Sequence, residues 1–218
     1  MARDRRRRNE VAKLDATPPW ETKFREEPER TTGPYDELDA PADDLNRVDL
    51  GALRVPVEPG LDVRLEVNEQ QQVVAVTLVA AAPDGTLLGS VQVGVYAAPR
   101  NEGIWDEVRA EIAQSMNAQK GQPKEVHDGP WGTELVGKLP SGPGGTHVPV
   151  RFVGIDGPRW FVRALFAGAP AVDKAAAEQF ERALRNTVVV RGNSPQPVRE
   201  PVPLTLPKGV QLPGQDEG

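Results

Sequence analysis

The sequence has no cysteine among its 218 residues and only two histidines, His127 and His147. Without cysteine, the chain cannot form disulfides, thiolate nucleophiles or cysteine-ligated metal sites. The two histidines lie too far apart in sequence to form the histidine pair of a helical metal site, so each is expected at the surface. We therefore predict neither a metal nor a cofactor.

Long hydrophobic runs are also missing from the chain. No window approaches the roughly eighteen consecutive apolar residues that a membrane-spanning helix needs. The N-terminal segment MARDRRRR lacks the apolar stretch of a secretory signal. Together with the net charge of −6 and the lack of cysteine, these absences predict a soluble cytoplasmic protein without membrane contact.

Catalytic groupings are equally scarce. No serine lies in a Gly-x-Ser-x-Gly setting, and the glycine-rich run at 142–145 lacks the Gly-Lys-Ser/Thr ending of a phosphate-binding loop. Four carboxylates could in principle act as acid or base, but their spacing in the sequence does not distinguish them from ordinary surface or turn residues: Asp106, Glu107, Asp128 and Asp156. We predict a non-catalytic protein and identify no small-molecule substrate. The alternative, an enzyme acting through Asp or Glu with a supplied metal, requires a cleft with converging carboxylates.

The N-terminal part of the chain is strongly charged and poor in apolar residues. Residues 15–49 are predominantly acidic and interrupted by prolines, and they follow an arginine cluster formed by Arg3, Arg5, Arg6, Arg7 and Arg8. Such a composition cannot bury enough apolar surface to offset the entropy lost on ordering. Residues 1–45 are therefore predicted to be a disordered, charged tail.

Five segments before residue 141 have the hydrophobic pattern of strands: 61–67, 73–82, 86–97, 125–127 and 131–139. The first alternates between apolar and charged side chains, as in a strand with one wet face. The second and third have apolar side chains at both odd and even positions, which is typical of central strands covered on both faces. Pro83-Asp84-Gly85 predicts the turn between them. Residues 48–57 predict a short edge segment.

Two stretches have the three- and four-residue spacing of amphipathic helices. The first has its apolar positions at Ile104, Trp105, Val108, Ile112 and Met116, and Asn101 or Gly103 is its expected start. The second runs from about Asp173 to Arg185, with inward positions at Phe180, Ala183 and Leu184. The pattern leaves open whether the two helices pack on the same face of the sheet or on opposite faces.

Residues 148–166 predict a β-hairpin with its tip at Asp156-Gly157. Counting back from this tip places Phe152 opposite Phe161 and Val153 opposite Trp160. One face carries Val150, Phe152, Arg159, Phe161, Arg163 and Leu165, and the other carries Arg151, Val153, Ile155, Trp160, Val162, Ala164 and Phe166. Both faces are mainly apolar, so both must be covered.

These elements predict an α+β fold, a single domain over residues 46–192 with a mainly antiparallel β-sheet and two principal α-helices. Residues 193–218 are predicted to be a proline-rich, extended C-terminal tail, because six prolines after Gly192 prevent a regular helix. Val202, Leu204 and Leu206 alternate within this tail, so an extended segment laid against the core is also open.

Tryptophan and arginine side chains carry the functional hypothesis. Since catalytic groupings are missing, residue types that are enriched at docking surfaces favour a protein-binding or adaptor module with an unknown protein partner. The candidate partner-binding residues are Trp105, Arg109, Arg151, Arg159, Trp160 and Arg163. The tryptophans are also good core residues, and burial of both indoles would remove this patch. The arginines of the predicted strands, Arg151, Arg159 and Arg163, can equally pair with carboxylates such as Asp106 or Glu134.

Nucleic-acid binding is the alternative binding hypothesis. Arg151, Arg159 and Arg163 interleave with aromatic residues in the predicted strands, a mixture found in proteins that stack bases. The run Arg3, Arg5, Arg6, Arg7 and Arg8 offers contacts to phosphates without sequence preference. No ribonucleoprotein-type Gly-Phe/Tyr-Gly/Ala-Phe motif accompanies these arginines.

Three separated motifs occur along the chain: NEGIWDEVR at 101–109, RFVGIDGPRWF at 151–161 and TVVVRG at 187–192. With these motifs the chain resembles the actinobacterial proteins of domain-of-unknown-function family 3710, from about Val48 to Pro207. The resemblance implies a cytoplasmic bacterial protein with a variable charged N-terminal tail. It brings no assigned reaction, cofactor or catalytic residue.

Overall fold

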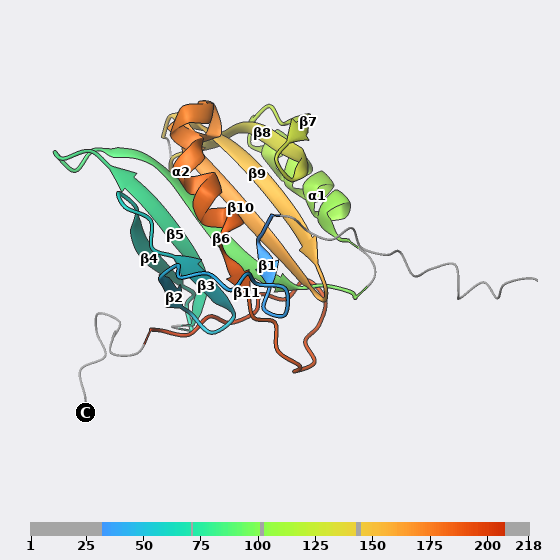
Figure 1. Ribbon diagram of the computed structural model, residues 1–218. Helices are drawn as coiled ribbons and strands as arrows, with labels where there is room; N and C mark the ends of the chain where they lie inside the picture. The colour runs from blue at the N-terminus through green and yellow to red at the C-terminus, as the bar shows by residue number, and fades with distance from the viewer. Residues whose placement is uncertain (1–31, 71, 101–102, 143–144, 208–218) are drawn as a thin grey trace, which may run out of the picture. The chain divides into compact units, whose positions relative to one another are not determined.

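The computed structural model describes residues 32–70, 72–100, 103–142 and 145–207. These residues form an α+β fold with two β-sheets and two α-helices (Figure 1). The predicted fold class is thereby confirmed. In the described part of the chain, neither helix combines the length and the apolar character that crossing a bilayer requires.

The larger sheet has seven strands in the order β4-β5-β6-β10-β9-β8-β7, and all neighbouring strands are antiparallel. Its strands are β4 (Asp62–Val67), β5 (Val73–Ala81), β6 (Leu87–Ala97), β7 (Lys124–Gly129), β8 (Gly132–Pro140), β9 (His147–Gly157) and β10 (Trp160–Gly168). Every strand expected from the hydrophobic pattern is present. β5 and β6 lie inside the sheet, as apolar side chains on both parities predict.

The smaller sheet has the order β1-β11-β3-β2. Its strands are β1 (Tyr35–Asp36), β2 (Arg47–Asp49), β3 (Leu53–Pro56) and β11 (Val188–Val189). β1 pairs with β11 in parallel, whereas β3 pairs with both β11 and β2 in antiparallel orientation. The edge segment predicted at 48–57 is therefore divided between β2 and β3, and it belongs to this second sheet.

The β9–β10 hairpin turns at residues 158–159, two positions beyond the predicted tip. The predicted pairs Phe152–Phe161 and Val153–Trp160 are wrong, because each β9 residue pairs four positions further along β10. A proline suits the first turn position, since its φ is already fixed near −65°. The displacement is an even number of residues, so each side chain keeps the face that the alternation predicts.

The two helices, α1 (Trp105–Ala118) and α2 (Lys174–Arg185), cover opposite faces of the larger sheet. α1 packs on β8 and β9 over a cluster that includes Trp105, Met116, Leu135, Val150, Phe152 and Phe161. α2, the short 3-10 helix η3 (Ala169–Ala171) and the smaller sheet cover the other face, over Val91, Val93, Val162, Phe166, Phe180 and Leu184. In Figure 1, α2 crosses the front of the sheet. Each fully buried Phe or Leu contributes about 1.5–3 kcal/mol of transfer free energy to this double core.

Ordered structure begins earlier than the predicted domain boundary. Residues 33–45 were expected in the disordered tail, yet Tyr35 donates its backbone N–H to Thr187 O at 3.0 Å. The Trp160 indole donates to Asp36 Oδ2 at 2.9 Å, and the Trp131 indole donates to the Gly33 carbonyl at 2.9 Å. The tail–domain boundary at residue 45 is therefore wrong by about twelve residues, because β1 pairs with β11. Residues 1–31, with the arginine cluster, lie outside the described residues.

The described part of the C-terminal tail is extended and lies against the core. Val202 donates its backbone N–H to Val95 O at 2.8 Å, and Leu204 donates to Val73 O at 2.9 Å. Both side chains are 5% exposed. The docked extended segment that the alternation allowed is thus present over residues 200–205, after a turn at 198–199, and residues 208–218 lie outside the described residues.

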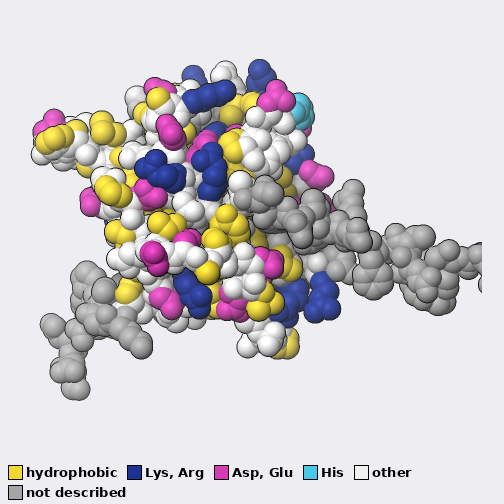
Figure 2. Space-filling model, in the orientation of Figure 1, with side chains coloured by type: hydrophobic (Ala, Val, Ile, Leu, Met, Phe, Trp, Pro, Cys, Tyr) yellow, Lys and Arg dark blue, Asp and Glu magenta, His cyan; other side chains and the backbone are white. Residues whose placement is uncertain are grey.

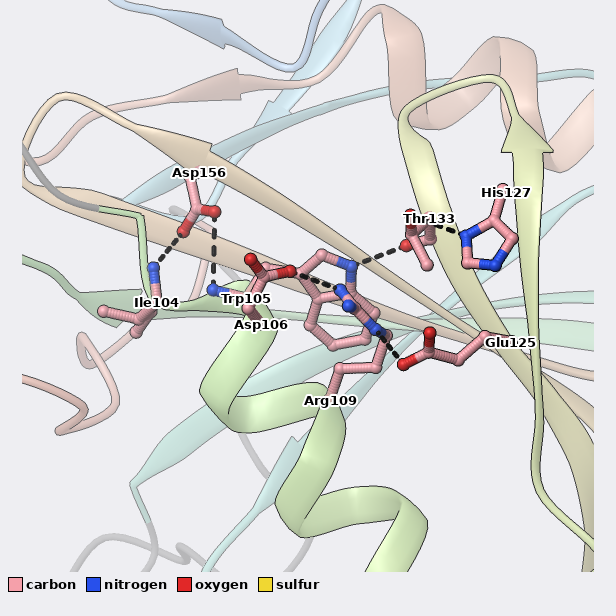
Figure 3. Close-up of polar contacts among 8 residues, drawn as sticks. All are labelled: Ile104, Trp105, Asp106, Arg109, Glu125, His127, Thr133 and Asp156. Atoms are coloured by element: carbon pink, nitrogen blue, oxygen red, sulfur yellow. Dashed lines mark hydrogen bonds and ion pairs between the residues drawn. The ribbon is translucent and has the colours of Figure 1, made fainter.

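Helix α1 begins one residue after Ile104, and its N-terminus is capped from another strand (Figure 3). The carboxylate of Asp156 in β9 accepts from the backbone N–H of Ile104 at 2.8 Å and of Trp105 at 3.4 Å. The predicted start at Gly103 is therefore wrong, since a distant side chain supplies the cap. Asn101, the other predicted start, lies outside the described residues. α2 begins where predicted, with Asp173 as its N-cap.

The Asp156 cap gives a direct test of how α1 is held to the sheet. Asp156→Ala removes the acceptor for two backbone N–H groups, so we expect a loss of about 1 kcal/mol in the free energy of unfolding, measured by urea denaturation. Asp156→Asn keeps an oxygen acceptor and should retain most of the stability. Equal midpoints for Asp156→Ala and the unaltered protein would show that the cap contributes nothing.

Candidate functional site

A cleft of about 480 Å³ opens on the α2 face of the larger sheet. One wall comes from β7, β8 and the turn between them, and the other comes from η3 and the first half of α2. Its lining residues are Val126, Asp128, Gly129, Pro130, Glu134, Val136, Arg151, Pro170, Ala171, Val172, Asp173, Lys174, Ala177 and Glu181. This volume lies within the range of about 300–1,000 Å³ that is usual for ligand sites.

A network of ionised side chains lines the cleft beside α2. Arg151 in β9 places its Nη2 2.7 Å from Glu181 Oε1 and its Nη1 3.5 Å from Glu134 Oε2. Arg185 holds the second oxygen of Glu181 at 2.8 Å. The Arg151 guanidinium also lies over the ring of Phe166, with its carbon 4.1 Å from the ring centroid. These contacts hold both terminal nitrogens of the Arg151 guanidinium, so the side chain is a preorganised part of the cleft.

Glu134 is the unusual member of this network, because it is only 3% exposed. Burial raises the pKa of its carboxyl above the ordinary value; Arg151 opposes the shift and the negative charge of Glu181 adds to it. Its Oε1 atom and the Nε atom of Arg151 make no hydrogen bond to the described residues. The carboxyl packs against Gly129, where any Cβ would lie 2.3 Å from the carboxyl carbon. A buried acceptor without a donor is costly, and it marks a place where a ligand can supply one.

The charges that line the cleft are predominantly negative. Four carboxylates, Asp128, Glu134, Asp173 and Glu181, face two cations, Arg151 and Lys174. The cleft thus favours a cationic ligand over an anionic one. Over the rest of this face, acidic and basic side chains are interspersed (Figure 2). Among the described residues, no three His, Asp or Glu side chains are grouped so that they would hold a metal ion.

The two candidate tryptophans are core residues on opposite faces of the sheet. Trp105 is 6% exposed on the α1 face, stacks on Phe161 at 6.0 Å between ring centroids and donates its Nε1–H to Thr133 O at 2.7 Å (Figure 3). Trp160 is fully buried on the α2 face. The burial of both indoles removes the tryptophan patch that the sequence suggested, because each ring lies inside a hydrophobic cluster.

The four candidate arginines are also dispersed. Arg109 on α1 lies between Asp106 and Glu125, at 2.7 and 2.8 Å, on the α1 face of the sheet (Figure 3). Arg163 lies on the same face, over the ring of Tyr96. Arg151 lines the cleft on the other face, and Arg159 lies in the β9–β10 turn. Six candidates that looked like one patch therefore occupy four separate environments.

Part of the pairing was nevertheless predicted, and part of the site was missed. Arg151 does pair with Glu134, whereas Asp106 pairs with Arg109 on its own helix, a pair that was not predicted. Asp128, one of four carboxylates without a distinguishing spacing, lines the cleft. Glu181 was missed, because on its own helix it reads as an ordinary exposed position. Arg151 itself could have pointed to this glutamate. A cation on an otherwise apolar strand face needs carboxylate partners, and these must come from the elements that pack against that face.

The raised pKa of Glu134 predicts a specific dependence of stability on pH. The folded state holds the Glu134 proton more tightly than the unfolded state, so this group's contribution falls as the pH rises from the ordinary glutamate pKa through the folded-state pKa. Glu134→Gln lacks this titration. We expect its free energy of unfolding, relative to the unaltered protein, to increase with pH across that window and then to level off.

Urea denaturation at a series of pH values measures this difference. Glu69→Gln, at an exposed turn position, serves as the matched control and should give a flat difference profile. A flat profile for Glu134→Gln as well would show that Glu134 titrates normally in the folded protein.

Comparisons with known proteins agree with the resemblance seen in the motifs. Residues 33–212 match the model of a family described as "Protein of unknown function (DUF3710)". No curated protein gives a significant match. A crystal structure from Bacteroides thetaiotaomicron VPI-5482 at 1.50 Å resolution is similar, with 14% identity and a TM-score of 0.39, over 67% of this chain and 48% of that one. The chain thus spans about half the length of that structure. The family model covers most of the sequence, and the protein therefore belongs to the DUF3710 family.

Proposed function

We propose that the protein is a non-catalytic binding module of the cytoplasm, and that its cleft accepts a lysine or arginine side chain of a partner protein. The observation that carries this proposal is Glu134, a buried carboxylate with an unpaired oxygen in a predominantly acidic cleft. The cysteine-free composition supports a reducing compartment.

A cationic side chain would supply the hydrogen-bond donor that Glu134 Oε1 lacks in the cleft. An ammonium or guanidinium group carries several N–H donors and a positive charge, so it provides both the hydrogen bond and the charge that Glu134 lacks. Asp128, on β7, has an exposed carboxylate at the rim of the same cleft. Glu181 is less available, because two arginines already occupy its two oxygens.

The position of β7 favours a side chain of a peptide over a free amine. β7 is the last strand in the order of the larger sheet, and among the strands that the structure describes it pairs only with β8. Val126 and Asp128 alternate along β7 and both line the cleft. An extended segment that pairs with the outer edge of β7 would therefore direct every second side chain toward the cleft, as in recognition by strand addition.

Four carboxylates line the cleft, a feature that the alternative of a carboxylate-dependent enzyme also requires. The geometry gives this alternative less support. Glu181 is fixed in two ion pairs, Asp173 caps α2, and Glu134 packs against Gly129. The sheet arginines give the nucleic-acid alternative little support, because Arg151 is ion-paired and lies on the opposite face from Arg163.

Fluorescence anisotropy with labelled pentapeptides tests the proposed function. The peptides share valine-rich flanks and differ in the central residue, which is lysine, arginine or norleucine. We expect the basic peptides to bind more tightly than the norleucine peptide, and to weaken with added salt. Glu134→Gln should weaken binding about tenfold, because one charge-assisted hydrogen bond is lost. Asp62→Asn, an exposed carboxylate on the opposite edge strand, is the control and should change nothing.

The pH dependence of this binding separates a specific contact from general attraction. The cation binds the ionised form of Glu134, whose pKa burial raises, so affinity should increase with pH through the folded-state pKa. Glu134→Gln should abolish that increase. Equal affinity for lysine and norleucine peptides, or an equal loss in Asp62→Asn, would contradict the proposal.

A further inference from the structure

Two arginines meet at the end of the sheet that is furthest along β10 from the cleft. Arg159 lies in the β9–β10 turn, directly before β10, whereas η3 of the cleft follows the other end of that strand. Arg191 follows β11, and its Nε donates to the Arg159 carbonyl at 3.1 Å. In return, Arg159 Nη2 donates to the Gly192 carbonyl at 3.0 Å. The two guanidinium groups are therefore held beside one another by backbone atoms.

Neither guanidinium is neutralised by the described residues. Among all the described residues, the arginines that form ion pairs are Arg47, Arg54, Arg109, Arg151, Arg182, Arg185 and Arg199. Arg159 and Arg191 form no such pair, and they bond to carbonyl oxygens and to Asn193 instead. Arg191 is also only 9% exposed, and both its burial and the charge of Arg159 lower its pKa. Two adjacent cations without an anion, one of them buried, are unfavourable unless something binds them.

The backbone of Arg159 has an unusual conformation. Arg159 has a φ of 63°, a left-handed conformation in which glycine is the favoured residue. A glycine would make the same turn at lower cost, so this turn carries a guanidinium at the expense of some backbone strain. Three guanidinium nitrogens of the two arginines donate to no described residue: Arg159 Nε, Arg159 Nη1 and Arg191 Nη2.

A segment that leads to a third cation passes beside this pair. The backbone N–H of Ala98 donates to the Arg159 carbonyl at 3.1 Å, and exposed Arg100 follows two residues later. Figure 2 shows Lys and Arg side chains next to one another at this end of the sheet. The positive charge here contrasts with the acidic cleft at the other end.

We infer that Arg159 and Arg191 form a binding site for a phosphate group. A phosphate monoester carries a charge of about −1.5 to −2 at pH 7, which matches two guanidinium groups, and its oxygens accept several charge-assisted hydrogen bonds. A carboxylate would neutralise only one of the two charges. The site is independent of the cleft, so each proposal stands if the other fails.

Isothermal titration with inorganic phosphate tests this inference, with sodium chloride used to keep the ionic strength constant. We expect saturable binding to the full chain, and thermal stabilisation that grows with phosphate concentration. Arg159→Gln should weaken the apparent affinity at least about tenfold. The control Arg163→Gln alters an arginine that contacts only the Tyr96 ring among the described contacts, and it should leave phosphate binding unchanged.

A second variant guards against loss of folding as the cause. Arg191→Lys keeps the charge of the more buried arginine but loses its planar donors, so it should bind phosphate more weakly while retaining the circular dichroism spectrum. Titration with a phosphoserine peptide and with its unphosphorylated form shows whether a phosphorylated protein is a source of the group. Stabilisation by chloride equal to that by phosphate, or unchanged binding in Arg159→Gln, would overturn the inference. Binding of single-stranded DNA without any binding of phosphate would overturn it as well.

Discussion

The β9–β10 hairpin has apolar side chains on both faces, and this single property determines the rest of the structure. A strand pair of this kind must be covered twice. α1 and its cluster around Trp105 cover one face, and α2 with the smaller sheet covers the other. The first and last described segments also help to cover the hairpin, because Asp36 of β1 accepts from the Trp160 indole and Val202 bonds to the backbone of β6.

The cleft lies where that cover ends. η3 and the first turn of α2 leave the sheet open toward β7, and Arg151 is the charged residue on the face of β9 at this point. Its charge requires carboxylates from the neighbouring strand and from the helix, which Glu134 and Glu181 provide. The burial of Glu134 thus follows from placing a cation in a strand that is otherwise apolar, and the same placement leaves one of its oxygens without a donor.

Local patterns were enough to predict the strands of the larger sheet, the two helices and the side-chain faces of the β9–β10 hairpin. They were not enough for features that depend on tertiary contacts. The α1 cap comes from Asp156, far away in sequence, and the β9–β10 register depends on which residues of a Gly-Pro-Arg segment form the turn. Order before residue 45 depends on a two-residue parallel pairing with β11 that has no hydrophobic pattern of its own. The candidate patch failed for a related reason: Trp105 and Trp160 have the composition of an interface, but their burial is decided by the elements packed over them.

The pairing of β6 with β10 has a consequence for how the chain reaches its native state. Gly89 pairs with Gly168 and Ala97 with Trp160, so the centre of the sheet joins segments that are synthesised far apart in time. β4, β5 and β6 pair consecutively and are joined by short turns, but the edge of β6 has no partner until β10 has been synthesised. Contacts of such long range slow folding, and an open valine-rich edge is prone to pair with other chains. The nascent protein is therefore most vulnerable to aggregation during synthesis of α1, β7, β8 and β9.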